Sequence, residues 1–131
     1  ALVTGYASRS VYLWAGGAHR RFSSSGGERP GDQTMASLVV GYRPSFFRHD
    51  YPSPDWRGFL EVVAEWAGPD RIASRDAPDT GGRQLVLALT ALGLYGSWGI
   101  AVGPGFPVVD DMNGAQPEER VRFALNVTFW W

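Results

Sequence analysis

Cysteine and lysine are both missing from this chain of 131 residues. The absence of cysteine excludes disulfides, thiolate metal ligands and a cysteine nucleophile. All 12 basic residues are arginines, and they are balanced by 13 acidic residues to a formal charge of −1. The chain therefore lacks the basic excess that holds a phosphate backbone, and nucleic acid is excluded as a partner. Its first residues lack the charged segment and long apolar run of a signal peptide, so none is predicted there.

What the chain has in quantity is apolar surface: 44% of its residues are hydrophobic and 14% are aromatic. A disordered chain carries far less. The length predicts one domain over residues 1–131, or part of one.

The longest uncharged stretch, residues 85–109, has the length of a transmembrane helix. Five glycines and two prolines interrupt it, and each costs a helix interior about 1 and about 3 kcal/mol respectively. Its two halves alternate between larger and smaller side chains, with a break at residues 95–97. The stretch is therefore predicted to form two strands joined by a tight turn.

The same period of two recurs in residues 36–42, 58–67 and 120–131. Residues 6–22 are predicted to form a further strand, whose orientation the pattern leaves open. Polar segments rich in glycine and proline separate these runs, at residues 23–33, 44–56, 68–82 and 110–117. The pattern predicts an all-β fold of about six antiparallel strands.

Two architectures fit this outline, an antiparallel transmembrane β-barrel and a soluble antiparallel barrel or sandwich. The barrel is favoured by aromatic residues near the ends of the apolar runs. Trp98 and Phe106 are eight residues apart on one face. That spacing is roughly 26 Å along a strand, or about 20 Å of height at a barrel's tilt, which is close to the thickness of an apolar membrane band.

The alternation divides the candidate functional residues between the two sides of such a barrel. Polar residues are predicted to line the lumen as a solute or ion path, or to fill it with ion pairs: Glu61, Glu65, Gln84, Thr90, Arg120, Arg122, Asn126 and Thr128. Aromatic residues are predicted to face lipid and form girdles: Tyr42, Trp66, Trp98, Phe106, Phe129 and Trp131.

The segment from Trp98 to Trp131 resembles the end of a bacterial outer-membrane β-barrel, an alternating strand that finishes on an aromatic residue. Together with residues 59–66 (FLEVVAEW), it is similar to the family of transporters assigned to the MetA pathway of phenol degradation, over residues 56–131. The resemblance implies an outer-membrane protein of a Gram-negative bacterium that is inserted by the barrel-assembly machinery, with its C-terminus in the periplasm.

Six strands do not close a barrel, because open sheet edges cannot face lipid and bacterial single-chain barrels begin at eight strands. The chain is therefore predicted to be the C-terminal half of a larger barrel, or to be completed by other strands or chains. Counting back from a periplasmic C-terminus places residues 110–117, 68–82 and 23–33 outside the cell and the other two connections inside.

Catalytic and metal sites find less support in the sequence. Aligning Asn113 and Gly114 with a calcium-binding loop puts Val109 and Arg120 where acidic ligands belong. The pairs His49–Asp50 and Asp110–Asp111 suggest a barrel enzyme that activates water, but the count places them at opposite ends of the barrel. No metal and no cofactor is predicted.

The sequence thus predicts an outer-membrane channel or transporter for a small hydrophobic or aromatic solute, without enzymatic activity. Its partners would be the lipid bilayer, the assembly machinery and the solute. A soluble barrel or sandwich that binds a small ligand is the alternative, and a barrel enzyme is the weaker one.

Overall fold

The computed structural model describes residues 1–131 and contains one large antiparallel sheet of seven strands. The strands are β1 (Leu2–Ala7), β2 (Val11–Arg20), β4 (Gln33–Tyr42), β5 (Asp55–Ala67), β8 (Gly82–Tyr95), β9 (Trp98–Met112) and β10 (Arg122–Phe129). They lie side by side in chain order, and every neighbouring pair is antiparallel. The predicted all-β antiparallel fold is confirmed.

The N-terminal segment holds two strands where the sequence predicted one. Residues 8–10 turn the chain back, and Ser8 closes this turn by accepting a hydrogen bond from the Val11 amide through its side chain and donating its own amide to the Val11 carbonyl. The polar tripeptide from Ser8 to Ser10 was the signal in the sequence for this turn, and the prediction of one strand from Tyr6 to Phe22 overlooked it. The sheet accordingly has seven strands, one more than the sequence predicted.

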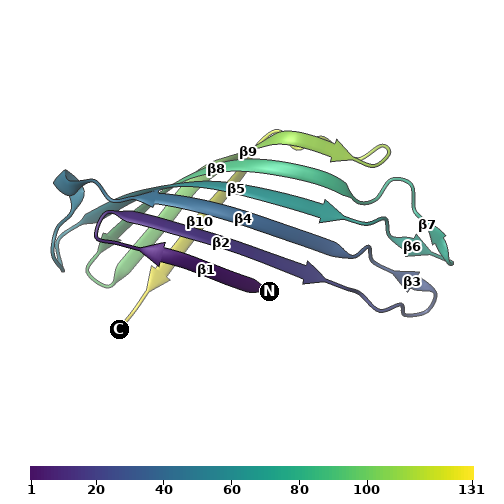
Figure 1. Ribbon diagram of the computed structural model, residues 1–131, viewed down its shortest axis with the longest axis horizontal. Coiled ribbons are helices and arrows are strands. Elements are labelled where there is room, and N and C mark those ends of the chain that lie inside the picture. Colours follow the sequence, from purple (N-terminus) through teal and green to yellow (C-terminus); the bar gives the residue numbers. More distant parts are fainter.

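The connections differ between the two ends of the sheet (Figure 1). At one end, here called the turn end, lie the β1–β2 and β8–β9 turns and the β4–β5 connection, which contains the short 3-10 helix η1 (Ser45–Phe47). The other end, the loop end, has the β2–β4, β5–β8 and β9–β10 loops. A small sheet of β3 (Glu28–Arg29), β6 (Arg71–Ile72) and β7 (Arg75–Asp76) joins the first two of these loops.

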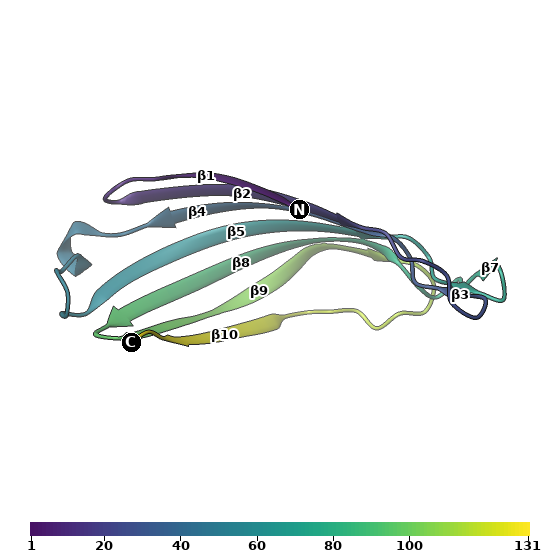
Figure 2. The same ribbon diagram turned by 90° about the horizontal axis from the view of Figure 1, so that it is seen from below.

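The seven strands curl into an arch that does not close into a barrel (Figure 2). Strands β1 and β10 form its two free edges, and no hydrogen bonds join them. Only 7 of the 131 residues are buried, so the arch encloses no core comparable to that of a globular domain. No second sheet packs against either face, which removes the two-layer sandwich as an architecture for this chain.

The bend of the arch gives the sheet a concave and a convex face. Side chains from strands that are not neighbours meet on one face only: Tyr12 of β2 meets Phe59 of β5, and Arg122 of β10 meets Glu65 of β5. Such contacts require side chains to converge, so this face is the concave one. No helix in the structure is both long and apolar enough to cross a membrane.

Candidate functional site

The strand register places the predicted site residues on two opposite faces. Because partners across an antiparallel ladder project to the same side, the pairings assign each strand position to a face. Of the residues predicted to line a lumen, seven lie on the concave face: Glu61, Glu65, Gln84, Thr90, Arg122, Asn126 and Thr128. Of those predicted to face lipid, five lie on the convex face: Tyr42, Trp66, Trp98, Phe106 and Phe129.

Two of the predicted residues lie outside the strands. Arg120 precedes β10, which begins at Arg122, and Trp131 follows its end at Phe129. The uninterrupted alternation extended the predicted strand over both residues. The β9–β10 loop instead folds back at its end, where the Glu119 amide donates a hydrogen bond to Asp110, and β10 begins two residues later than Arg120. Trp131 is fully exposed, and its ring lies 6.5 Å from that of Phe129.

Away from its loop end, where Arg83 pairs with Asp111 at 2.8 Å, the convex face is apolar from one edge of the arch to the other. Large side chains from all seven strands remain at least two-fifths exposed on it, among them Leu2, Leu13, Leu38, Leu60, Leu89, Ile100 and Leu125. At Gly58 and Ala91 the small side chains leave a hollow of about 600 Å³, rimmed by Tyr42, Leu60 and Val102. Contiguous exposed apolar surface of this kind marks contact with a membrane, another protein or a ligand.

The concave face carries charge along several strands, and most of that charge is paired. The Arg122 guanidinium donates hydrogen bonds of 2.6 Å to both Gln84 and Glu119, and it lies 3.4 Å from the carboxylate of Glu65. Gln84 also donates to Asp110 of β9 at 3.3 Å. The network thus ties β5, β8, β9 and β10 together on the inside of the arch, near its loop end.

A second ion cluster lies on the same face at the turn end. Asp55 is only 5% exposed, and its carboxylate accepts hydrogen bonds from Arg43 at 2.7 Å and from Arg57 at 2.8 Å. The sequence did not predict this cluster, because Asp55 is far in sequence from Arg43 and follows a proline-rich connection. The alternation of side chains along the strand was the available signal, because it places Asp55 and Arg57 on the same face as Glu61.

Three aromatic rings gather between the two ion clusters, on the β2 and β5 part of the concave face. The Tyr12 and Trp14 ring centroids are 5.6 Å apart, and the Phe59 ring is 6.0 Å from that of Trp14. Phe59 lies over Gly41, where a β-carbon would clash with its ring. The sequence did not predict this cluster, because the alternation in the β2 segment did not show which residues share a face.

The β8–β10 part of the concave face carries small side chains beside these rings. Its residues between the ion clusters include Ala88, Thr90, Ala101, Gly103, Gly105 and Ala124. The concave face therefore has an aromatic half and a small-residue half.

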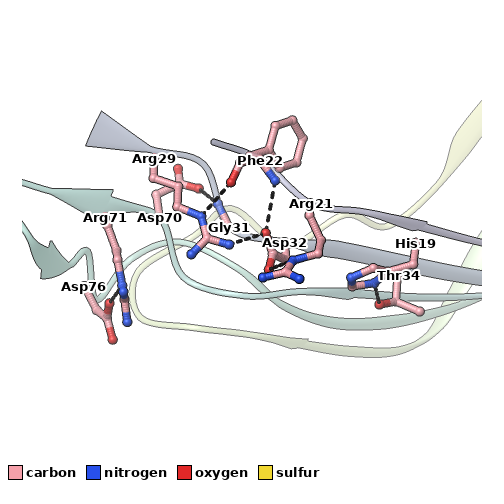
Figure 3. Close-up of polar contacts among 10 residues, drawn as sticks. All are labelled: His19, Arg21, Phe22, Arg29, Gly31, Asp32, Thr34, Asp70, Arg71 and Asp76. Atoms are coloured by element: carbon pink, nitrogen blue, oxygen red, sulfur yellow. Dashed lines mark hydrogen bonds and ion pairs between the residues drawn. The ribbon is translucent and has the colours of Figure 1, made fainter. Parts of the chain in front are cut away.

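The loop end is held together by polar contacts between the long loops (Figure 3). Asp32 accepts hydrogen bonds from the Arg29 guanidinium and from the Phe22 amide, and Asp70 accepts one from the Gly31 amide. The Arg29 guanidinium, first by its hydrogen bond and then by its charge, lowers the pKa of Asp32, and the Phe22 amide acts in the same direction. The Gly31–Asp70 hydrogen bond and the small β3–β6–β7 sheet thus link the β2–β4 and β5–β8 loops at this end of the arch.

The residues considered for catalysis are separated in the structure. His49 lies in the β4–β5 connection at the turn end, whereas Asp110 and Asp111 lie at the loop end of β9. The two pairs therefore do not share a water molecule. His19 accepts or donates one hydrogen bond with Thr34 at 2.8 Å, and its side chain is exposed. No group of three or more acidic or histidine residues is placed to hold a metal ion.

Comparison with known proteins adds no assignment: no family model matches the chain, and no curated protein or solved structure matches it. The resemblance to outer-membrane transporters thus remains a prediction from the sequence.

Proposed function

We propose that this chain forms part of the wall of a bacterial outer-membrane β-barrel that passes or binds a small solute. The observation that carries the proposal is the separation of the two faces. The convex face is apolar across seven strands, while the concave face carries ion pairs, amides and small residues. Transmembrane barrels have this distribution, with apolar side chains toward lipid and polar ones toward the lumen.

Strand length supports the same proposal. The five central strands have 10, 10, 13, 14 and 15 residues. A tilted strand needs about 9 to 11 residues to span a bilayer. The connections also follow the barrel pattern at two of the three turn-end positions, which are short, while the three loop-end connections are long. The β4–β5 connection at the turn end is the exception.

The two free edges require further strands, because unpaired backbone groups are too costly to leave in lipid. The number of strands restricts what supplies them. Seven antiparallel strands leave β1 and β10 running in the same direction, so an all-antiparallel closure needs an odd number of additional strands. If copies of the arch were inserted in the same direction, β10 of one copy would lie parallel to β1 of the next. The arch is therefore completed by strands other than copies of itself.

The experiment is to isolate outer membranes from the bacterium that produces the protein, where the strands that complete the arch are present, and to compare the migration of this chain on a gel with and without boiling. A membrane-embedded barrel remains folded in detergent until it is heated, so the band is expected to shift on boiling. A chain that is found in the soluble fraction, with no heat-dependent shift, would contradict the proposal and favour a soluble ligand-binding protein.

A further inference from the structure

Glu61 differs from the other acidic side chains on the concave strand surface. Asp55, Glu65 and Asp110 each accept hydrogen bonds from arginine or glutamine. Glu61 lies half-buried in the middle of β5, between Val39 and Ala88, and forms neither an ion pair nor a hydrogen bond. Its charge has no counterpart within the chain.

The nearest arginine along the same cross-strand row does not compensate this charge. The register sets Glu61 opposite Ala88, Ala88 opposite Gly105, and Gly105 opposite Arg122. Three strand spacings amount to about 14 Å. The Arg122 guanidinium is already held by Glu119, Gln84 and Glu65, and thus points toward the loop end.

Two aromatic residues lie on the other side of Glu61 on the concave face. Phe59 is two residues away on the same face of β5, and Trp14 lies in the same cross-strand row beyond Val39. The Tyr12 ring is occupied by Arg57, whose guanidinium carbon is 5.4 Å from the ring centroid. The rings of Trp14 and Phe59 carry no such cation, although an aromatic face attracts one.

We propose that Glu61, Trp14 and Phe59 form a binding site for a small organic cation, an ammonium group that carries apolar substituents. The carboxylate would neutralise the charge, the two rings would contact the substituents, and the small side chain of Ala88 beside Glu61 would leave room for them. An inorganic divalent ion does not fit, because it requires several oxygen ligands and Glu61 supplies one carboxylate. This site rests on the proposed function, because it names the class of solute that the lumen of the barrel would take.

The test is isothermal titration of the purified chain in a non-ionic maltoside detergent with benzyltrimethylammonium. Benzyl alcohol serves as the neutral probe and benzenesulfonate as the anionic one. The cation is expected to bind at least tenfold more tightly than either. Glu61→Gln is expected to raise the Kd for the cation tenfold or more, and to leave the weak binding of benzyl alcohol unchanged.

Glu65→Gln is the matched control, because Glu65 lies on the same strand and face but beside Arg122. It is expected to change the Kd for the cation less than threefold. Trp14→Leu is expected to weaken binding as well, and the Glu61 comparison remains decisive if that variant does not fold. Equal affinity for the charged and neutral probes, equal effects of the two glutamine variants, or no binding by the parent chain would each overturn the site.

The boiling shift separates this result from the proposed function. A chain that shifts on boiling but does not bind the cation retains the barrel and loses the site. A chain that binds the cation but shows no shift has the site on an arch outside a membrane.

Discussion

Adjacent side chains on β10 project from opposite faces of the sheet. Leu125 projects from the convex face opposite Val102, midway between Trp98 and Phe106, and is 70% exposed. Its neighbour Asn126 projects from the concave face. If the convex face contacts lipid, the two positions differ greatly in what they tolerate.

Arginine at these two positions provides the first prediction. Leu125→Arg should lower the free energy of unfolding by about 2 to 4 kcal/mol, because it buries a charge at the bilayer midplane. Asn126→Arg should cost much less, since the proposed function places water on the concave face. Urea titration of both variants in lipid vesicles measures the difference. Equal losses would contradict the assignment of faces.

The ordered loops provide a pH-dependent prediction. The pKa values of Asp32 and Glu119 are lowered, chiefly by hydrogen bonds from Arg29 and Arg122 respectively. Each carboxylate therefore stabilises the fold fully above its pKa in the unfolded chain. This contribution is lost as the pH falls through the lower pKa of the folded state.

Limited proteolysis of the loops at a series of pH values, with an acid-stable protease, measures this loss. Cleavage should increase as the pH falls below about 4, the ordinary range of these carboxyl groups. The double variant Asp32→Asn and Glu119→Gln should be cleaved faster at neutral pH and show a weaker dependence on acid. Identical pH profiles for the parent and the double variant would exclude these two groups as the cause.

At the scale of elements, the alternation of side chains predicted strands and their faces well. Leu60, Leu89 and Ile100 fall on the predicted face because one side of the sheet is apolar throughout, which fixes the period of two. The turn at Ser8 was missed although its three residues are polar. The start of β10 was missed because it depends on a hydrogen bond from Glu119 to Asp110, which the alternating sequence does not reveal.

The contacts of the concave face were predictable only in part. Parity placed Glu65, Gln84 and Arg122 on one face, but their pairing depends on how far the sheet bends. The curvature arises from interactions across the whole sheet, and no local pattern encodes it. The aromatic cluster and the Asp55 ion pairs depend on the same curvature.

Glycine in β9 provides the test at this scale. A β-carbon at Gly103 would overlap the Leu89 carbonyl of β8, whereas one at Gly58 in β5 meets no atom within 4 Å. Gly103→Ala should therefore separate the two strands and lower stability by about 1 to 3 kcal/mol, while Gly58→Ala should cost nothing measurable. Thermal unfolding of the two variants distinguishes them. A tolerated alanine at Gly103 would show that β8 and β9 pack less closely there.

For the whole molecule, the odd number of strands predicts that copies of the arch do not close it. Tyr6 on β1 and Phe123 on β10 lie in corresponding rows on the convex face. Since the chain has no cysteine, Tyr6→Cys with Phe123→Cys reports only on contact between these edges. The double variant should give no more cross-linked dimer in membranes than either single variant. Dimers that require both cysteines would show that copies of the arch close on one another.

The proposed function requires that lipid covers the convex face and water covers the concave one. Single cysteines introduced in turn from Phe123 to Thr128 can each carry a spin label, because no native thiol competes. Electron paramagnetic resonance in lipid vesicles then compares collisions with oxygen, which partitions into lipid, and with a water-soluble nickel complex. We expect the favoured collision partner to alternate strictly along the strand. Oxygen should be favoured at Phe123, Leu125 and Val127, and the nickel complex at Ala124, Asn126 and Thr128. Access of the nickel complex to all six positions would contradict it.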